Sequence, residues 1–282
     1  MVKPSQTPDT ILEAEDDADA VGIVRYDGET PRVTADALAA EEPLEIRVRG
    51  HAVSVTMRTP GHDEELAAGF LLAEGLLRRP ADVLRIEPCL RNEDGNVVNA
   101  VLAPDVPFDL ARLTRHVFAS SSCGLCGKAT IDAVHAALPP VPVDDGLTIE
   151  PQTLYRLPPI MRAAQDTFAR TGGLHAAALF TAAGELACLR EDVGRHNAVD
   201  KVLGHALLTG LYPLDRHVLL VSGRSSFEIM QKALAGRIPI VAAVSAPSSL
   251  AVRFAASANQ TLIGFLRDRR MNVYTHPHRV RP

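Results

Sequence analysis

The chain has 282 residues, of which 46% are hydrophobic and 22% are charged, as in ordinary folded proteins. The first 20 residues hold six acidic side chains against one lysine, and they account for the whole net charge of −5. The balanced charge of the remainder argues against a nucleic-acid binder, which needs a basic domain. With no signal-type apolar segment and no long uncharged apolar run, we expect a cytoplasmic protein without membrane contact.

The first half of the chain is predicted to be α+β. Residues 1–20 form an acidic tail that we expect to be disordered. Residues 21–140 are predicted to form the N-terminal domain, with a hairpin over 45–57, a helix that ends near residue 77, and strands over 83–88, 97–102 and 114–118. Prolines 139, 140 and 142 begin a cluster of helix and strand breakers, which we take as the domain boundary.

The second half, residues 141–282, alternates strands with helices. Strands or hairpins are predicted over 174–190, 217–222, 238–245, 261–266 and 271–274, and helices over 198–208, 227–235 and 248–257. Strands that alternate with helices of this length predict an α/β domain with a mixed sheet. In such a domain, ligands bind where strands end and helices begin.

Cys123 and Cys126 form a CxxC pair in a Ser/Gly-rich segment that precedes a predicted helix. A helix N-terminus and the nearby Lys128 stabilise a thiolate, which is the reactive form of cysteine. Nucleophilic sulfur chemistry is therefore reasonable. From the spacing alone, structural zinc, a thioredoxin-type redox pair and coincidence stay open, although no second CxxC follows.

A zinc-dependent deaminase is a rival prediction. Nucleobase deaminases combine an H-x-E motif with P-C-x-x-C, and His62 and Glu64 form an H-x-E ahead of the cysteine pair. Ser122 stands where the proline belongs, and several predicted strands separate the two motifs. The match is therefore incomplete.

Polar residues gather where strands of the second half end. Ser222, Gly223 and Arg224 follow an apolar strand, and helical N–H groups, hydroxyls and a guanidinium can bind phosphate together. Arg195, His196 and Asn197 lie between a strand and a helix, and His175 follows two glycines. Helix caps, an exposed salt bridge and a buried histidine would explain the same residues structurally.

Taken in order, these motifs resemble the formate dehydrogenase accessory sulfurtransferase family, FdhD. The resemblance is carried by residues 59–61, 121–128, 171–175, 190–201, 221–224, 243–251 and 272–274. It extends from about residue 20 to the C-terminus, and several long motifs in one order are far more specific than one CxxC.

The resemblance implies a sulfurtransferase. Such a protein takes persulfide sulfur from a cysteine desulfurase and delivers it to the bis-molybdopterin guanine dinucleotide molybdenum cofactor of formate dehydrogenase. By this similarity Cys123 carries the persulfide and Cys126 assists or resolves it. The family likeness also implies a cytidine-deaminase-like second domain and a homodimer. A non-catalytic cofactor chaperone is the alternative.

The resemblance also places a cofactor-binding stretch near the C-terminus. Residues 251–282 carry six arginines against one aspartate, which favours anions there. The stretch comprises Phe265, Leu266, Arg267, Asp268, Arg269 and Arg270. Together with His175, Arg195, His196, Asn197, Ser222, Gly223 and Arg224, these residues make up the predicted cofactor site. A solvated basic turn between two strands is the structural alternative.

Overall fold

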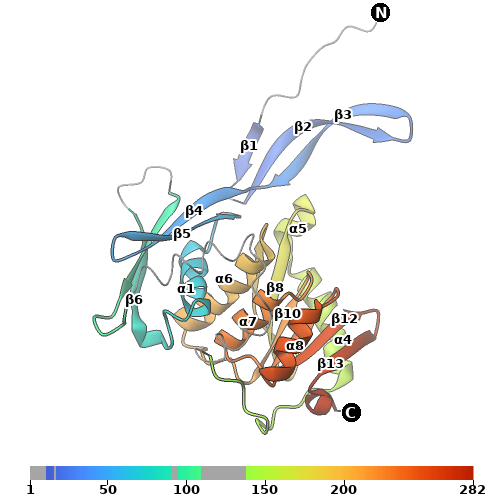
Figure 1. Cartoon of the computed structure of the whole chain (residues 1–282). Helices are drawn as coiled ribbons and strands as arrows, with labels where there is room; N and C mark the ends of the chain where they lie inside the picture. The colour runs from blue at the N-terminus through green and yellow to red at the C-terminus, as the bar shows by residue number, and fades with distance from the viewer. Residues whose placement is uncertain (1–10, 16, 90–94, 109–137, 282) are drawn as a thin grey trace, which may run out of the picture.

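The computed structural model describes residues 11–15, 17–89, 95–108 and 138–281 (Figure 1). Within these residues the strands form three sheets, of three, four and six strands. The α+β character of the first half and the mixed sheet of the second half are both confirmed. No helix of the described part is long and apolar enough to cross a membrane.

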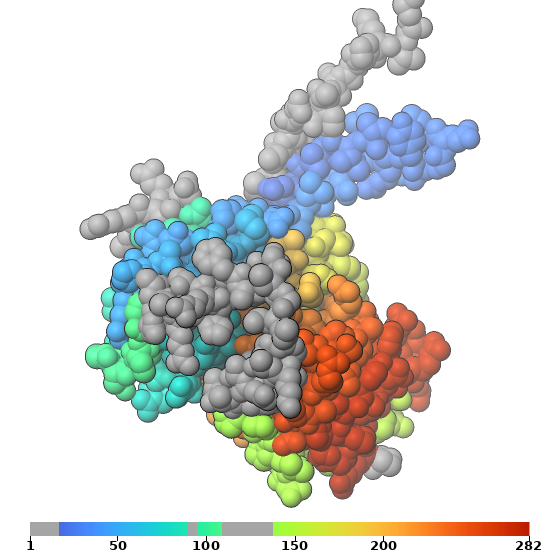
Figure 2. All heavy atoms as spheres, in the orientation of Figure 1, coloured from blue at the N-terminus to red at the C-terminus, as the bar shows by residue number. Residues whose placement is uncertain are grey.

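The three-stranded sheet projects from the body of the protein as an arm (Figures 1 and 2). It comprises β1 (Ile11–Glu15), β2 (Ala18–Asp27) and β3 (Thr30–Ala39). The prediction of a disordered tail through residue 20 is therefore wrong at residues 11–15 and 17–20. Backbone pairing outweighs the acidic composition here, because β2 pairs with β3 over its whole length and β1 pairs with the start of β2.

The four-stranded sheet follows the order β5-β4-β7-β6. Its elements are β4 (Glu42–Val48), β5 (His51–Arg58), β6 (Val83–Pro88) and β7 (Val97–Leu102), with α1 (Asp63–Ala73) and the short 3-10 helix η1 (Pro80–Asp82) between β5 and β6. Leu44, Ile46 and Val48 alternate along β4 and are fully buried. The predicted hairpin and the strands 83–88 and 97–102 are confirmed, and the predicted helix is present but ends at Ala73 rather than near residue 77. The predicted strand 114–118 lies outside the described residues.

The six-stranded sheet follows the order β13-β12-β11-β10-β8-β9. Its strands are β8 (His175–Thr181), β9 (Leu186–Asp192), β10 (His217–Val221), β11 (Ile240–Ala243), β12 (Thr261–Arg267) and β13 (Arg270–Thr275). The associated helices are α4 (Pro151–Ala163), α5 (Asp166–Thr171), α6 (Arg195–Leu208), α7 (Phe227–Ala235), α8 (Ser249–Ser257) and the C-terminal 3-10 helix η2 (Pro277–Arg279). β10, β11 and β12 are parallel, while β8 is antiparallel to β10 and β13 is antiparallel to β12.

Helices cover both faces of this sheet. Leu219 and Val221 of β10 belong to one apolar cluster with α6, α7 and α8, and their neighbours Val218 and Leu220 belong to a second cluster with α4. Because side chains alternate between the two faces of a strand, successive residues of β10 pack against helices on opposite faces of the sheet. The second half is thus a helix–sheet–helix sandwich. Its likeness to cytidine deaminases stays a prediction.

The two halves share one core. Leu44 of β4 and Leu66 of α1 lie in the same apolar cluster as α6 and β10. α1 crosses α6 at two glycines: a Cβ on Gly69 would lie 1.8 Å from the carbonyl oxygen of Asp200, and one on Gly204 would lie 1.8 Å from that of Glu65. The helix backbones are therefore in direct contact. The hydrophobic core is continuous across the predicted boundary near residue 140.

Candidate functional site

Most of the cofactor residues predicted from the sequence lie at one edge of the six-stranded sheet. β9 through β12 point their carboxyl ends to this edge, and β8 begins there, because His175 pairs with Asp192. The edge therefore holds His175 and the segments 193–197, 222–226, 244–249 and 265–270. This is the position at which open α/β sheets bind ligands.

Gly223 lies between His175 and Arg195. A Cβ at Gly223 would lie 3.4 Å from Nδ1 of His175 and 3.7 Å from Cδ of Arg195. The Oγ of the neighbouring Ser222 accepts a hydrogen bond from the Ala176 N–H at 2.9 Å, and the Ser222 N–H donates to the Ala176 carbonyl at 3.0 Å. The absence of a side chain at Gly223 thus lets β8, β10 and α6 approach one another. Ser222 joins the end of β10 to β8.

Arg195 is the first residue of α6, and its Nε is buried without a hydrogen-bond partner among the described residues. A buried guanidinium nitrogen without a partner is costly unless a ligand supplies an acceptor. Burial and the Arg195 charge both lower the pKa of His175. This corner of the edge therefore favours an anion, and Arg224 adds an exposed guanidinium after β10.

His196 faces the start of α7. Its Nε2 lies 3.2 Å from Oγ of Ser226 and 3.7 Å from Oε2 of Glu228. Burial lowers the pKa of His196 to about 4, and the charges of Arg195 and Lys232 add to this effect. The imidazole is therefore neutral near pH 7 and can accept or donate a hydrogen bond. Glu228 was not predicted as a site residue; its position in the first turn of a strand-end helix was the available signal.

Asn197 differs from its predicted role. Its Nδ2 donates to the Met57 carbonyl at 2.8 Å and to Oδ1 of Asp192 at 2.9 Å, so both amide hydrogens are used inside the protein. Its Oδ1 accepts from the Thr56 hydroxyl at 3.3 Å. These contacts tie β5 to α6, and they favour a structural role over cofactor binding.

Asp192 and Lys201 form a fully buried ion pair behind the edge. Nζ of Lys201 lies 2.8 Å from Oδ2 of Asp192 and donates to the Thr59 carbonyl at 2.8 Å. Asp192 also accepts from the N–H groups of Thr59 at 3.2 Å and Gly194 at 2.8 Å. One carboxylate thus connects the segment before α1, the end of β9 and the start of α6. This network holds Arg195 and His196 in place.

The basic stretch at 265–270 is the tip of the β12–β13 hairpin. Asp268 and Arg269 form its two-residue turn at φ 50° and 57°, and Arg267 pairs with Arg270 beside it; all four side chains are exposed. The Phe265 N–H donates to the Ser245 carbonyl at 3.1 Å, which joins the hairpin to the end of β11.

Two residues of the basic C-terminal region have buried side chains. Leu266 is fully buried in the apolar cluster on the α4 face, which favours a packing role over cofactor binding for its side chain. Arg279, part of the positive surplus, is also fully buried, where it pairs with Asp145 at 2.8 Å and donates to the Pro142 carbonyl at 3.0 Å. It anchors the C-terminus to the connection between the two halves.

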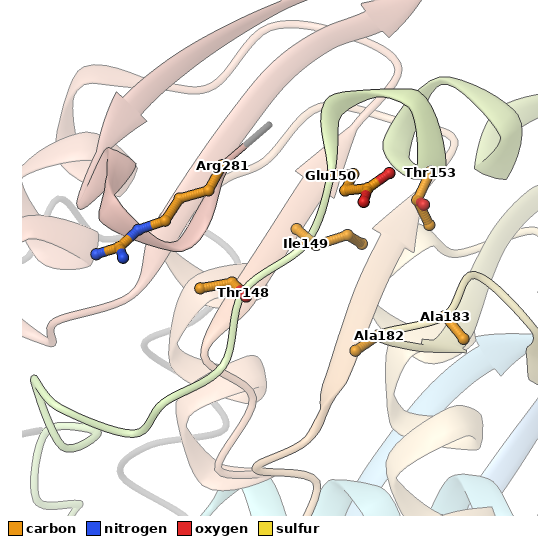
Figure 3. Close-up of a pocket in the computed structure, with 7 residues that line it drawn as sticks. All are labelled: Thr148, Ile149, Glu150, Thr153, Ala182, Ala183 and Arg281. Atoms are coloured by element: carbon orange, nitrogen blue, oxygen red, sulfur yellow. The ribbon is translucent and has the colours of Figure 1, made fainter.

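A depression of about 380 Å³ lies elsewhere (Figure 3). Ala182 and Ala183 line it at the far end of β8, opposite to His175, together with Thr148, Glu150 and Arg281. None of the predicted site residues contributes to it. It is therefore separate from the sheet edge.

Cys123 and Cys126 lie outside the described residues. The H-x-E motif is described: His62 is the N-cap residue of α1, and its Nδ1 lies 3.4 Å from Oε2 of Glu65, whereas Glu64 is exposed. The described residues contain no group of three or more His, Cys, Asp or Glu side chains suited to a metal ion. This arrangement gives no support to a deaminase centre built on His62 and Glu64.

Comparison with known proteins identifies the family. The chain is 54% identical over 257 residues to a protein of Streptomyces avermitilis named "Sulfur carrier protein FdhD", covering 87% of this chain and 89% of that protein. A protein of the same name from Mycobacterium tuberculosis is 52% identical over 253 residues, with 87% and 92% covered.

The fold is also found among solved structures. The crystal structure of a putative formate dehydrogenase accessory protein from Desulfotalea psychrophila matches with a TM-score of 0.75 and 22% identity, covering 94% of this chain and all of that one. The FdhD/NarQ family itself is matched over residues 39–281. The resemblance seen in the sequence is confirmed, and the chain belongs to the FdhD/NarQ family.

Proposed function

We propose that this protein is a sulfurtransferase. It accepts persulfide sulfur from a cysteine desulfurase on Cys123 and delivers it to the bis-molybdopterin guanine dinucleotide molybdenum cofactor, which activates a formate dehydrogenase. The observation that carries the proposal is the convergence of His175, Arg195 and Arg224 on one strand edge in a chain whose relatives are named sulfur carriers.

The sheet edge suits a ligand that carries several phosphates. α7 and α8 begin there, and helix N-termini present free N–H groups and a partial positive charge to anions. The unpartnered Nε of Arg195 supplies a further donor, and Arg267 and Arg270 add exposed guanidinium groups on the hairpin tip. Each guanine dinucleotide arm of the proposed substrate carries two phosphates, which arginine binds through paired hydrogen bonds.

The sulfur steps use thiolate chemistry. The Cys123 thiolate attacks the outer sulfur of the desulfurase persulfide, a new S–S bond forms at Cys123, and the donor cysteine leaves as a thiolate. Attack of the Cys126 thiolate on Sγ of Cys123 then breaks that bond and releases the outer sulfur as hydrosulfide. The two thiolates supply the two electrons that reduce the outer sulfur to hydrosulfide, and they remain as a Cys123–Cys126 disulfide. A cellular thiol must reduce this disulfide before the next cycle.

Replacement of Cys123 tests the sulfur role. Cys123→Ala should abolish activation of formate dehydrogenase in a strain that lacks the native protein, while circular dichroism and the unfolding midpoint stay unchanged. Cys89→Ala is the matched control, since a thiol outside the CxxC should leave activation intact. Full activation by Cys123→Ala would overturn the role assignment.

Nucleotide binding tests the sheet edge separately. With guanosine diphosphate as the probe, Arg195→Gln should weaken binding roughly 10- to 150-fold, because a charge-assisted hydrogen bond contributes about 1.5–3 kcal/mol. Arg216→Gln is the control, since Arg216 precedes β10 at the opposite edge and should change affinity less than twofold. Equal affinities of the two variants for guanosine diphosphate would show that this probe does not bind at the sheet edge.

The alternative is a cofactor chaperone that binds the same substrate without moving sulfur. It predicts that a variant lacking both Cys123 and Cys126 still binds the cofactor and still activates the dehydrogenase. The sulfurtransferase proposal predicts that the same double variant binds the cofactor but does not activate the dehydrogenase.

A further inference from the structure

His175 lies at the sheet edge with both ring nitrogens available. It is the first residue of β8 and pairs with Asp192, the last residue of β9. The ring is half-buried, and neither nitrogen makes a hydrogen bond to a residue that the structure describes. The adjacent Ser222 bonds to Ala176 and leaves the imidazole untouched. An imidazole in this state can accept a hydrogen bond donor or, when protonated, donate from both nitrogens.

The nearest cation is also unpaired. His175 and Arg195 approach one another across Gly223, since a Cβ on that glycine would lie 3.4 Å from Nδ1 of His175 and 3.7 Å from Cδ of Arg195. In the described ranges the Arg195 guanidinium makes neither an ion pair nor a hydrogen bond, and its Nε is buried. One group with a positive charge and one that can acquire it therefore lie side by side.

The nearest carboxylate does not neutralise this pair. Asp192 is buried, and its two oxygens are engaged by Nζ of Lys201 at 2.8 Å and by N–H donors of Thr59, Gly194 and Asn197. Its charge is thus balanced by Lys201 and cannot also pair with His175.

The other ionisable groups of this corner do not supply a counter-charge either. His196, the next residue of α6, turns its Nε2 towards Ser226 and Glu228 on α7. Arg224, after β10, adds an exposed cation. Burial and the charge of Arg195 hold the pKa of His175 below its ordinary value, and Asp192 offsets this only in part. In the protein alone, His175 is therefore neutral near pH 7.

A phosphate bound to Arg195 reverses this balance. It would lie close to His175, because only the missing side chain of Gly223 separates the two groups. An opposite charge within about 4–6 Å favours the charged form of a titratable group. We propose that His175 binds a phosphate of the ligand as an imidazolium, so that each ligand is bound together with one proton from solvent. This inference rests on the proposed function, because it concerns the same ligand and the same sheet edge.

The coupling between proton and ligand is reciprocal. The phosphate strengthens proton binding at His175 by the same factor by which the proton strengthens phosphate binding. The complex holds more protons than the free protein, so affinity is greatest at low pH. It falls as the pH rises through the pKa that His175 has in the complex.

Binding of guanosine diphosphate mannose at pH 6 and at pH 8 tests this coupling. Both phosphates of the probe are diesters whose charge is constant over this range, so a change in affinity belongs to the protein. We expect the dissociation constant to rise at least about fivefold from pH 6 to pH 8, and less than about twofold in His175→Gln, whose amide does not titrate. The control is His217→Gln, a half-buried histidine at the opposite edge of the same sheet, which should keep the full pH dependence.

Calorimetry measures the proton directly. At pH 7 the binding enthalpies in PIPES and in Tris, which have different ionisation enthalpies, should reveal uptake of up to one proton per ligand in the native protein and close to none in His175→Gln. Binding without proton uptake and without pH dependence would overturn this inference and leave the phosphate site in place. Uptake that persists in His175→Gln, or loss of all binding in that variant, would also overturn it. Absence of binding to the native protein at both pH values would overturn the phosphate site of the proposed function as well.

Discussion

Removal of the Lys201 charge should destabilise the protein strongly. Lys201→Met keeps most of the side-chain length but leaves the buried Asp192 carboxylate without its cation, 2.8 Å away in the native protein. Breaking a buried pair from one side costs about 3–5 kcal/mol, because an uncompensated charge remains in the interior. The N–H groups of Thr59 and Gly194 still contact Asp192, so we expect the lower end of this range.

Urea denaturation, followed by circular dichroism, measures the effect. The control is Arg85→Met, which breaks a pair of similar length, 2.9 Å from Glu87, on the exposed surface and should cost less than about 1 kcal/mol. The double variant Asp192→Asn/Lys201→Met should lose less than the sum of the two single variants, since it leaves no unpaired charge. A loss below about 0.5 kcal/mol for Lys201→Met, or additivity in the double variant, would refute the reasoning.

Two further predictions concern the helix crossing and the strand edge. Gly69→Ala should destabilise the protein by about 1–3 kcal/mol or more, because its Cβ would overlap the Asp200 carbonyl and force α1 away from α6. The control is Glu64→Ala, at an exposed position of α1. Equal denaturation midpoints for the two variants would contradict the close crossing of α1 and α6. Burial lowers the pKa of His196 to about 4 in the folded protein. The unfolded chain therefore takes up a proton near pH 6.5, before the folded protein does, and the free energy of unfolding falls as the pH drops from 6.5 towards 4. His196→Gln should reduce this fall, measured as the difference between urea midpoints at pH 7.5 and pH 5; an identical fall would show that His196 does not titrate as described.

The sheet edge could be predicted from the sequence because its signals are local. Ser222, Gly223 and Arg224 follow an apolar run of β10, and such a run followed by small polar residues indicates a strand end. Parallel strands bring their carboxyl ends to one side, so the alternation of elements also predicts that these residues meet. His175 arrives at the same edge only because β8 is antiparallel to β10, which local patterns do not specify.

Other features depend on contacts that are distant in the chain. The roles of Leu266 and Arg279 were missed, since their burial depends on α4 and on the connection near residue 145. α4 itself was not predicted, because Pro158 and Pro159 lie inside it and prolines usually end helices. The arm was not predicted either: an acidic segment is typical of disorder, and only pairing between β2 and β3 overrides that tendency.

The central claim is that Cys123 receives sulfur. The most direct measurement is peptide mass spectrometry of the full chain after incubation with a cysteine desulfurase and cysteine, with the added sulfur scored at each of the four cysteines. The sulfurtransferase account predicts one extra sulfur at Cys123, accumulation of that persulfide in Cys126→Ala, and no loading of Cys89 or Cys188. The buried Cys188, whose pKa burial raises to about 11, serves as the internal control. Unmodified Cys123 and Cys126 beside an active desulfurase would contradict the account.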